Sequence, residues 1–175
     1  LLANLPGRQG LRVCVIERSR GILPIPRAVH FDGETMRVFQ AAGLATEIMR
    51  ISRPGHGMHW VNAEGRTLLV REGIAGLGNQ GWHNDYYFHQ PELEAVLRAG
   101  LARYPDVHLR EGVQALGCEQ RADAVRLELE EPAGQARATL RCRYVVGCDG
   151  ARSAVRAWIG ERHEDLGLHQ AWLVV

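Results

Sequence analysis

The sequence contains no lysine, and all 21 of its basic residues are arginine. A Walker-type phosphate loop needs a Gly-Lys pair and a Schiff base needs a lysine amine, so both kinds of site are excluded. Serine is scarce as well: Ser19, Ser52 and Ser153 all lie outside any G-x-S-x-G motif. The nucleophile elbow of the common serine hydrolases is therefore also excluded.

Paired cysteines and long apolar runs are missing too. Cys14, Cys118, Cys142 and Cys148 form no C-x-x-C motif, and three of them lie in apolar, strand-like runs. We interpret them as small hydrophobic side chains in a reducing, cytoplasmic setting. No signal peptide is visible, and no apolar run approaches the roughly 18 residues of a membrane span. Because the chain starts with Leu1 and not with methionine, a targeting segment ahead of it stays open.

The composition indicates one globular domain. The chain has 175 residues, of which 46% are hydrophobic, so it can bury a core. A net charge of +1 gives no electrostatic case for binding nucleic acid or an anionic membrane surface. We also expect no metal site, because His56 and His59 lie at odd spacing on an expected strand and no acid or thiol cluster joins them. The pair His83 and His89 has no such cluster either.

The first 17 residues combine a helix end, a strand and an acid. Residues 1–10 are typical of a helix tail that ends in glycine turns, and residues 11–16 predict a buried strand that ends at Glu17. This order matches the second half of a βαβ unit that binds a dinucleotide, in which the acid accepts hydrogen bonds from the adenosine ribose. The glycine-rich phosphate loop of such a unit lies about 20 residues earlier, which places it before residue 1. Strand-end acids are common, so Glu17 alone does not decide the matter.

The middle of the chain predicts a stiff loop, two short helices, a hairpin and a longer helix. Proline makes residues 22–28 an extended loop. Asp32 can cap a helix that ends at Gly43, and a second short helix follows over residues 44–49. Two predicted strands, 56–62 and 67–70, flank a predicted turn at 63–66. The clearest helix starts at Gln90, with an apolar stripe at Leu93, Val96, Leu97 and Leu101, and Pro105 stops it.

The last third predicts strands joined by short turns. Strands are expected over residues 107–109, 113–119, 124–130 and 136–142, with turns at 121–123 and 132–134. Residues 144–148 predict a fully buried strand that ends at Asp149 and Gly150. A helix is expected over residues 153–159, and a last strand over 170–175. We expect the sheet to be mainly parallel, with a β-meander crossover.

Taken together, these features resemble the FAD-dependent aromatic hydroxylases of the p-hydroxybenzoate hydroxylase superfamily, most closely the 3-(3-hydroxyphenyl)propionate hydroxylase branch. The similar segments, in chain order, are RVCVIER (12–18), PRA (26–28), DGE (32–34), QAAGL (40–44), QPELE (90–94) and YVVGCDGARSAVR (144–156). The last is the most specific, because it contains D-G-x-x-S-x-V-R after a strand-like run. The resemblance covers nearly the whole chain in order.

The resemblance implies cofactor roles for four residues of the first half. Glu17 would hold the adenosine ribose of FAD, and Arg18 would flank the adenine. Arg27 would place a planar cation near the diphosphate, where bidentate geometry favours arginine. Gln90 would use its amide on the diphosphate or the ribityl chain, beside the N-terminus of its helix. From the residues alone, both have an alternative explanation. Arg27 would be a surface ion-pair partner, and Gln90 would merely precede a proline-initiated helix.

The resemblance implies a second group near the C-terminus. Asp149 and Gly150 would form a tight turn at the end of a strand, where open α/β sheets bind ligands, and the family uses this turn for FAD and the nicotinamide cofactor. Arg152, Ser153 and Arg156 would orient that turn, with Arg156 as a candidate phosphate contact. Alternatives remain at this point: Ser153 as an ordinary helix cap, the Asp149 turn as a simple connection and Arg156 as an ion-pair partner. The aromatic patch at Trp82 and residues 86–88 is explained either by the core or by stacking on flavin or substrate.

The fold class implied is α/β: an incomplete FAD-binding Rossmann-like domain of the glutathione-reductase type with a β-meander crossover. Residues 1–164 would form this domain without its first strand and glycine-rich loop, with a hairpin excursion near 56–70, and residues 165–175 would start a substrate domain. A G-D motif and much of the substrate domain would lie beyond residue 175.

The activity implied is hydroxylation of a phenolic aromatic acid with FAD, NAD(P)H as co-substrate and dioxygen. The chain itself offers no convincing catalytic acid or base. The alternatives are another FAD-dependent oxidoreductase or halogenase of the same fold, or a truncated, non-catalytic domain. The exact phenol, the choice between NADH and NADPH, FAD binding by this chain alone and a homo-oligomeric state stay open.

Overall fold

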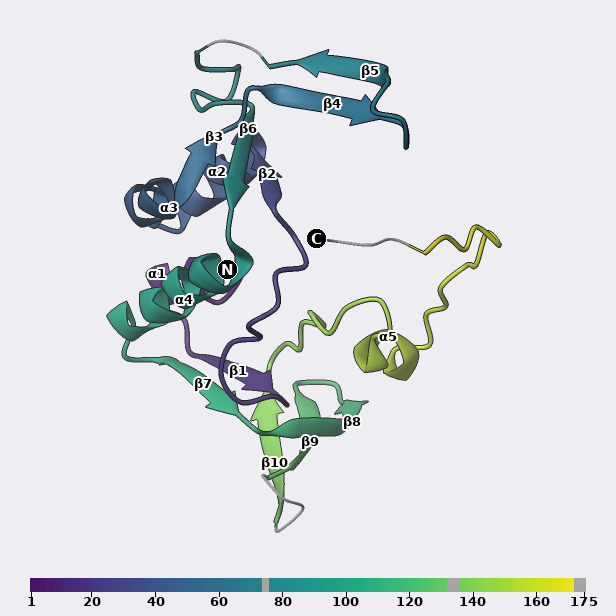
Figure 1. The fold of residues 1–175 in the computed structure, drawn as a ribbon. Coiled ribbons are helices and arrows are strands. Elements are labelled where there is room, and N and C mark those ends of the chain that lie inside the picture. The colour runs from purple at the N-terminus through teal and green to yellow at the C-terminus, as the bar shows by residue number, and fades with distance from the viewer. Residues whose placement is uncertain (74–75, 132–135, 172–175) are drawn as a thin grey trace. The chain divides into compact units, whose positions relative to one another are not determined.

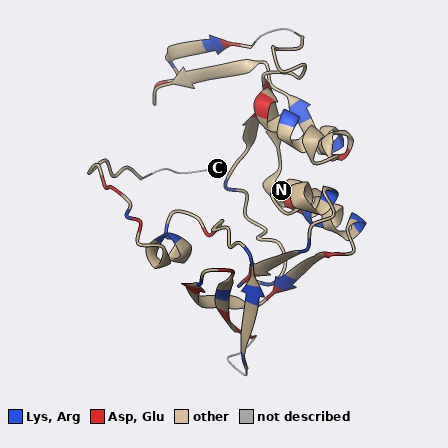
Figure 2. Ribbon diagram, turned by 180° about the vertical axis from the view of Figure 1, so that it is seen from behind, with Lys and Arg blue, Asp and Glu red and all other residues tan. Residues whose placement is uncertain are grey.

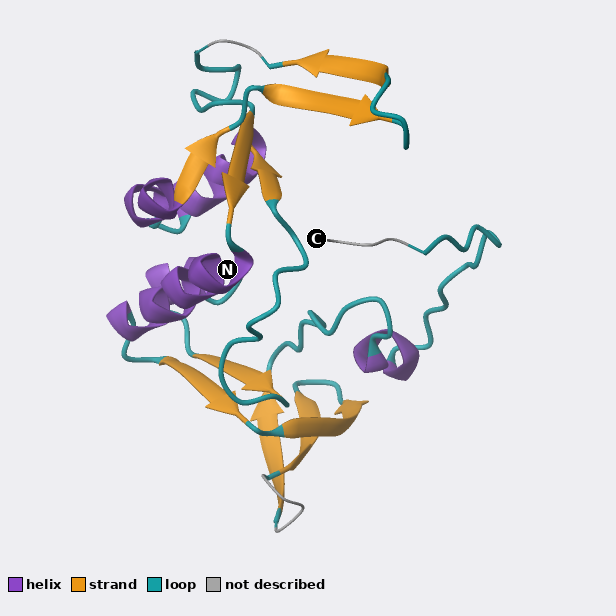
Figure 3. Ribbon diagram, in the orientation of Figure 1, coloured by secondary structure: helices purple, strands orange, loops and turns teal. Residues whose placement is uncertain are grey.

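The computed structural model describes residues 1–73, 76–131 and 136–171 (Figure 1). The chain divides into two compact units: Leu1–Cys14 with Ile22–His108, called unit 1, and Val15–Gly21 with Leu109–Val175, called unit 2. Within the described residues, helices α1 to α4 belong to unit 1 and α5 belongs to unit 2 (Figure 3). No helix in these ranges is both long and apolar enough to cross a membrane.

Local capping explains the first helices of unit 1. After the short α1 (Asn4–Arg8), helix α2 (Gly33–Ala41) starts where the side chain of Asp32 accepts a hydrogen bond from the Thr35 amide at 2.7 Å. This backbone N–H holds the pKa of Asp32 below its ordinary value. The backbone then reverses at Gly43, whose φ of 69° is readily adopted only by glycine, and α3 (Ala45–Ile51) follows. The predicted cap and the predicted glycine stop are both confirmed.

Helix α4 (Gln90–Ala99) follows the predicted pattern. Proline occupies its first turn, and the 3₁₀ turn η1 (Gly100–Arg103) continues it. Leu93, Val96 and Leu97 pack against the core of unit 1. The apolar stripe therefore does what its spacing predicts, although no residue of α4 is fully buried.

The core of unit 1 is made by helices α2 and α3 against a small sheet. Its buried members are Phe31, Met36, Phe39, Ala42, Leu44, Ile48 and Tyr86. The rings of Phe31 and Tyr86 stack with centroids 5.1 Å apart, and Trp82 and Phe88 pack at the edge of the same cluster. Of the two explanations for this aromatic patch, packing in the core is the one that the structure realises for Tyr86.

Two antiparallel sheets complete unit 1. Strand β6 (Asp85–Phe88) lies between β2 (His30–Asp32) and β3 (Ser52–Pro54). The hairpin expected near residues 56–70 forms from β4 (Gly57–Val61) and β5 (Thr67–Glu72), and the side chain of Asn62 accepts hydrogen bonds from two amides of its turn. Strands β2 and β3 were not predicted, because three residues are too few to show a period of two.

Unit 2 contains the expected antiparallel meander. Strand β9 (Val125–Glu130) lies between β8 (Gln114–Gln120) and β10 (Arg137–Cys142). Leu127 and Leu129 are buried together with Val113, so β9 turns one apolar face to the core of unit 2. The turn predicted at residues 132–134 lies outside the described residues.

Strands β1 (Val13–Glu17) and β7 (Val107–Glu111) pair with each other, and the boundary between the units passes through both. The Val13 amide donates to Asp106 at the start of the pair and the Val113 amide donates to Glu17 at its end, so the two strands are parallel. The other sheets of the described residues are antiparallel. A mainly parallel sheet is therefore not what these residues form, and β1 is half-buried and starts two residues later than predicted.

Two further expectations need correction or stay open. Residues 144–148 form no strand: Tyr144 is 80% and Val146 is 66% exposed, while Val145 packs on the core of unit 2. No strand of the described residues pairs with this segment, so the apolar run covers one side only. Gln170 and Ala171 are not in a strand, and the rest of the strand expected over 170–175 lies outside the described residues. The domain boundary after residue 164 stays a prediction.

Candidate functional site

The residues singled out from the sequence fall into two groups, one in each unit. Arg27 and Gln90 belong to unit 1, whereas Glu17, Arg18 and the segment from Asp149 to Arg156 belong to unit 2. Each group is built by its own set of hydrogen bonds.

Gln90 holds the proline-stiffened loop in unit 1. Its Oε1 accepts hydrogen bonds from the backbone amides of Arg27, at 2.7 Å, and of Ala28, at 3.0 Å. The Phe88 amide donates to the Val29 carbonyl at 3.0 Å, which fixes the next residue of the loop. The first residue of α4 thus sets the backbone position of a segment 63 residues earlier.

The guanidinium of Arg27 is presented by this held backbone. Arg27 is exposed, and within residues 1–73, 76–131 and 136–171 its side chain makes no hydrogen bond or ion pair. The Nε2 of Gln90 has no partner there either, and it can only donate. A cation on this loop and an amide donor on the helix residue that holds the loop suit an anion with several oxygen acceptors, such as a diphosphate. The ion-pair explanation for Arg27 is not realised among these residues.

Glu17 ends β1 in unit 2 with both its main chain and its side chain engaged. Its carbonyl accepts from the Val113 amide at 3.1 Å, and its Oε1 accepts from the Ser19 amide at 2.7 Å. The second carboxylate oxygen makes no hydrogen bond within the described part of the chain. Arg18, the next residue, is exposed. The carboxylate is therefore oriented at the strand end and keeps acceptor capacity for a hydroxyl group.

Asp149 caps helix α5 (Ala154–Trp158). Its Oδ1 accepts from the Ser153 hydroxyl at 2.6 Å, and its Oδ2 accepts from the amides of Ala154, at 2.6 Å, and Val155, at 3.2 Å. The Ser153 hydroxyl and these amides hold the pKa of Asp149 below its ordinary value. Ser153 in turn accepts from the Arg156 amide at 3.0 Å, so the capping role considered for this serine is what the structure shows.

Two glycines allow the chain to turn at this point. Gly150 has a φ of 80°, in the left-handed region that favours glycine. A Cβ on Gly147 would lie 2.8 Å from Cβ of Val155, so any side chain there would push the segment away from α5. The predicted tight turn after residue 148 is therefore present, although no strand precedes it.

The two arginines of this segment behave differently. Arg156 donates from Nη2 to the Ala151 carbonyl at 2.6 Å, so its guanidinium folds back onto the turn and makes no ion pair in the described ranges. Arg152 is exposed, with no hydrogen bond or ion pair in the part of the chain that the structure describes. Of the two, Arg152 is the one whose side chain is unengaged.

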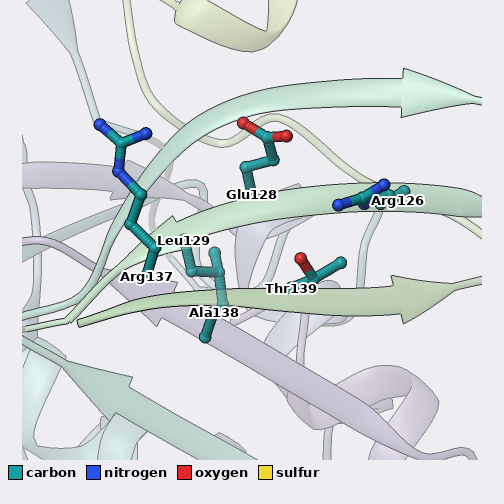
Figure 4. A pocket seen from close by; sticks show the side chains of 6 residues that line it. All are labelled: Arg126, Glu128, Leu129, Arg137, Ala138 and Thr139. Atoms are coloured by element: carbon teal, nitrogen blue, oxygen red, sulfur yellow. The ribbon is translucent and has the colours of Figure 1, made fainter.

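Glu17 and Asp149 follow segments that share one core. Ile16 and Val145 both pack against the cluster of Val113, Leu127 and Leu129. Two hollows defined by the structure lie on the meander instead. One, over β9 and β10, is lined by Arg126, Glu128, Leu129, Arg137, Ala138 and Thr139 (Figure 4). Neither is lined by Glu17 or Asp149, and the binding of one FAD by both of these residues stays a prediction.

A third cluster was missed by the sequence analysis. In unit 1 the buried carboxylate of Asp85 accepts from His30 Nε2 at 2.7 Å and from the guanidinium of Arg71. These residues come from β6, β2 and β5, and no short spacing in the sequence connects them. The one signal in the sequence is Asp85 itself, the single acid of the aromatic stretch 82–88, and its meaning is clear only from the structure.

Charge is spread over both units. Basic and acidic positions are interspersed along the elements in Figure 2, in keeping with a net charge of +1.

Comparisons with known proteins decide the family. Residues 1–174 match the family described as the FAD binding domain. The chain belongs to this family. The resemblance noted from the sequence and the α/β fold class are thereby confirmed.

The relatives of this FAD-binding domain have names of aromatic hydroxylases. One is named "Probable NADH-specific resorcinol 4-hydroxylase", from Rhodococcus jostii, and is 38% identical over 99% of this chain and 32% of its own length. Another, from Paraburkholderia xenovorans, is named 3-(3-hydroxy-phenyl)propionate/3-hydroxycinnamic acid hydroxylase and is 35% identical over 100% of this chain and 28% of its own length. The chain thus spans about a third or less of these relatives.

Solved structures show the same fold. p-Nitrophenol 4-monooxygenase from Pseudomonas putida superposes with a TM-score of 0.80 at 28% identity, over 90% of this chain and 40% of that one. Aklavinone-11 hydroxylase, solved with FAD and aklavinone, gives a TM-score of 0.74 at 27% identity, over 90% of this chain and 31% of that one.

Proposed function

We propose that the chain is the FAD-binding part of an aromatic monooxygenase that hydroxylates a phenolic aromatic acid with NAD(P)H and dioxygen. The observation that carries the proposal is the loop held by Gln90, which presents Arg27 in a chain that matches the FAD-binding family over residues 1–174. The names of the relatives support the choice of reaction and of phenolic substrates. When bound, FAD would supply the redox chemistry, since no side chain of the protein can replace it.

In unit 1, Arg27 and Gln90 bind the diphosphate in this proposal. Arg27 donates charge-assisted hydrogen bonds to phosphate oxygens, and Gln90 adds its Nε2–H while Oε1 keeps the loop in place. Because the backbone of the loop is already held, little conformational entropy is lost when the anion binds. Gln90 is thus both a ligand and a positioning residue.

In unit 2, Glu17 and the turn at Asp149 serve the cofactors. Glu17 accepts hydrogen bonds from the adenosine ribose through its second oxygen, and the exposed Arg18 flanks the adenine. Asp149 uses its carboxylate oxygens mainly to accept hydrogen bonds from α5, so it shapes the turn. Gly150 has no side chain and leaves room for the cofactor to approach the backbone. Ser153 and Arg156 brace the same turn, and Arg152 extends toward a cofactor phosphate. Arg156 reaches a phosphate only if it leaves the Ala151 carbonyl.

The setting proposed for this protein is the cytoplasm. Cys118, half-buried on β8, and Cys148, exposed beside the turn, are free thiols, which suits a reducing compartment. Nucleic acid and membranes are not expected partners, and self-association into a homo-oligomer is left open. The choice between NADH and NADPH is likewise open, although one relative is named as NADH-specific.

FAD binding by wild-type and variant chains tests the proposal. The purified protein is expected to show flavin absorption bands, or to acquire them when FAD is added. Arg27→Ala should weaken FAD binding about ten- to hundredfold, the loss expected for a charge-assisted phosphate contact. Arg66→Ala removes an equally exposed arginine from the turn of the β4–β5 hairpin and should leave the affinity unchanged.

Turnover then separates a monooxygenase from a binding module. Oxidation of NAD(P)H by the flavin-loaded protein, stimulated by a phenolic acid and accompanied by ring hydroxylation, is the expected result. A colourless protein that FAD cannot reconstitute would instead identify a non-catalytic domain. Flavin bands without stimulation by any phenol would point to another FAD-dependent reaction.

A further inference from the structure

The hairpin of β4 and β5 leaves apolar side chains exposed to solvent. All six residues of β5 are exposed, with Leu68 at 66% and Leu69 at 57%. On β4, Trp60 is 40% and Val61 is 56% exposed. In the part of the chain that the structure describes, none of these four side chains belongs to a buried cluster. Because a two-stranded hairpin is only marginally stable in water by itself, this hairpin gains stability from any further strand that joins it.

The base of the hairpin is fixed to the rest of unit 1. The guanidinium of Arg71 on β5 bonds to the buried carboxylate of Asp85 on β6. The Tyr87 hydroxyl, also on β6, donates to the Gly57 carbonyl at the start of β4, at 3.1 Å. Both strands are therefore held where they leave the sheet of β2, β6 and β3. A strand that joins this hairpin binds a surface that is already ordered, which lowers the entropy cost of binding.

The outer edge of β5 is open to pairing. No strand of the described residues other than β4 pairs with β5. Residues 67–70, Thr-Leu-Leu-Val, contain no charge and no proline, although edge strands are usually protected by one or the other. Leu68 also lies opposite no residue of β4, because Trp60 is matched with Leu69 and Val61 with Thr67. Such an edge is a template for backbone hydrogen bonds to another strand.

Charges at the two ends of β5 favour one kind of partner. Arg66 directly precedes the strand and Glu72 ends it, and both are exposed without an ion pair in the described residues. Figure 2 shows the middle of the hairpin in tan, with charged residues at its ends. A strand that is positive at its start and negative at its end is complementary to an antiparallel copy of itself. With Leu69 opposite its own copy, Arg66 lies opposite Glu72 of the partner subunit at both ends.

We propose that two copies of this chain pair antiparallel through the outer edges of β5, with Leu69 at the two-fold axis, and so form a four-stranded sheet. The contact uses the same surface on both copies, as two-fold symmetry requires. The chain spans about a third of its relatives, so a strand from elsewhere in a longer protein is the other candidate for this edge. The self-complementary charges of Arg66 and Glu72 favour the second copy. None of the residues assigned to FAD takes part, so the test needs no cofactor.

Sedimentation of the purified chain over a range of concentrations tests the proposal first. The wild type should change from monomer to dimer as its concentration rises. Arg66→Glu places like charges opposite each other at both ends of the paired strands, so the dissociation constant of the dimer should rise about tenfold. Glu72→Arg should have the same effect for the same reason. Arg12→Glu makes the same charge change at an exposed position of unit 1 and should leave the dissociation constant unchanged.

Restoring the charge match separates a lost contact from a variant that fails to fold. The double variant Arg66→Glu with Glu72→Arg again has opposite charges at the two ends of β5, so it should dimerise like the wild type. A mixture of the two single variants should form mixed dimers that are tighter than the dimers of either variant alone, because unlike charges then face each other at both ends.

Disulfide cross-linking tests the register of the pairing. Residues directly opposite each other in antiparallel strands have Cα atoms about 4.5–5.5 Å apart, which a disulfide can span. Leu69→Cys should therefore form a covalent dimer when an oxidant is added. Thr67→Cys should not, because the two copies of that residue would lie about 14 Å apart. Both variants also carry Cys148→Ser, since Cys148 is an exposed free thiol that would cross-link by itself.

Three results would overturn the proposal. A wild type that stays monomeric at every concentration would leave this edge to a strand from a longer protein. A dimer whose dissociation constant is the same in the wild type, Arg66→Glu and Glu72→Arg would be held by another surface. A dimer that cross-links through Thr67→Cys and not through Leu69→Cys would have a different register from the one that the charges predict.

Discussion

Unit 1 holds its site loop by contacts between residues far apart in the sequence, whereas unit 2 builds its site turn from neighbours. Gln90 reaches the backbone of Arg27 across 63 positions, while the partners of the Asp149 carboxylate in the described part of the chain lie four to six positions later. The buried clusters also differ in size: among the described residues, seven form the cluster of unit 1 and three form that of unit 2. A loop that depends on distant contacts loses its shape when the core is disturbed, and a locally capped turn keeps it.

The largest expected effect comes from the core of unit 1. Met36 is completely buried in α2, so Met36→Ala should lower the free energy of unfolding by about 3 kcal/mol. Val38 lies on the same helix and is 37% exposed, so Val38→Ala should cost only about 0.5 kcal/mol. Denaturant titration measures both. Equal losses would mean that this cluster is not the main support of unit 1.

The buried carboxylate of unit 1 comes next. Asp85→Asn should destabilise the protein by about 3 kcal/mol, at the low end for a broken buried pair because Arg71 is half-exposed. Asp123 pairs with Arg141 on the meander, where both side chains are more than 70% exposed, so Asp123→Asn should have no measurable effect. If the two variants were equally stable, the ion pairs of Asp85 in unit 1 would stabilise the protein no more than a surface ion pair does.

A smaller effect is expected at the long-range anchor. Gln90→Ala removes two hydrogen bonds, so the amides of Arg27 and Ala28 should exchange with solvent about tenfold faster. The amides of unit 2 should keep their rates. Gln120→Ala, at an exposed strand end, is the matched control. Unchanged exchange in Gln90→Ala would show that the loop is held by other contacts.

The smallest effect is expected at the local cap of unit 2. Ser153→Ala should lower the free energy of local opening of α5 by about 1 kcal/mol, and the effect should be confined to the amides of α5. Ser19→Ala should lower it less, because the side chain of Ser19 caps no helix. The pKa of Asp149 should rise toward its ordinary value of 3.8 in Ser153→Ala, because the hydroxyl that lowers it is gone. NMR titration of the carboxyl group measures this.

The sign of the pH effect follows from that pKa. A carboxyl whose pKa is lowered by folding stabilises the protein above its ordinary pKa, and this contribution is lost as the pH falls through the lowered value. The wild type should therefore lose this part of its stability below about pH 4, and Ser153→Ala should have less of it to lose. The same acid dependence in both proteins would mean that Ser153 does not act on Asp149.

Much of the fold could be predicted because its signals are local. Asp32 and Ser153 cap helices within three residues of themselves, Gly43 stops a helix by its own conformation, and the stripe on α4 repeats over several turns. Strands β2, β3 and β6 could not be predicted, since each is too short for a period and is paired with a distant segment. The prediction of a strand over residues 144–148 was wrong, because hydrophobic residues alone do not supply a strand to pair with.

The candidate site likewise has a part with local signals and a part without them. The cap by Ser153 and the turn at Gly150 follow from residue types next to each other. The double hydrogen bond from Gln90 to the loop of Arg27, and the meeting of His30, Asp85 and Arg71, depend on tertiary packing that no spacing in the sequence encodes.

One measurement tests most directly whether the two groups serve one ligand. Amide NMR spectra of the chain are recorded as FAD is added. We expect saturable shifts with one common affinity in both units, at Arg27, Ala28 and Gln90 and at Glu17, Arg18 and residues 149–156. Shifts confined to the meander around Arg126 and Arg137, or no shifts at all, would contradict this expectation.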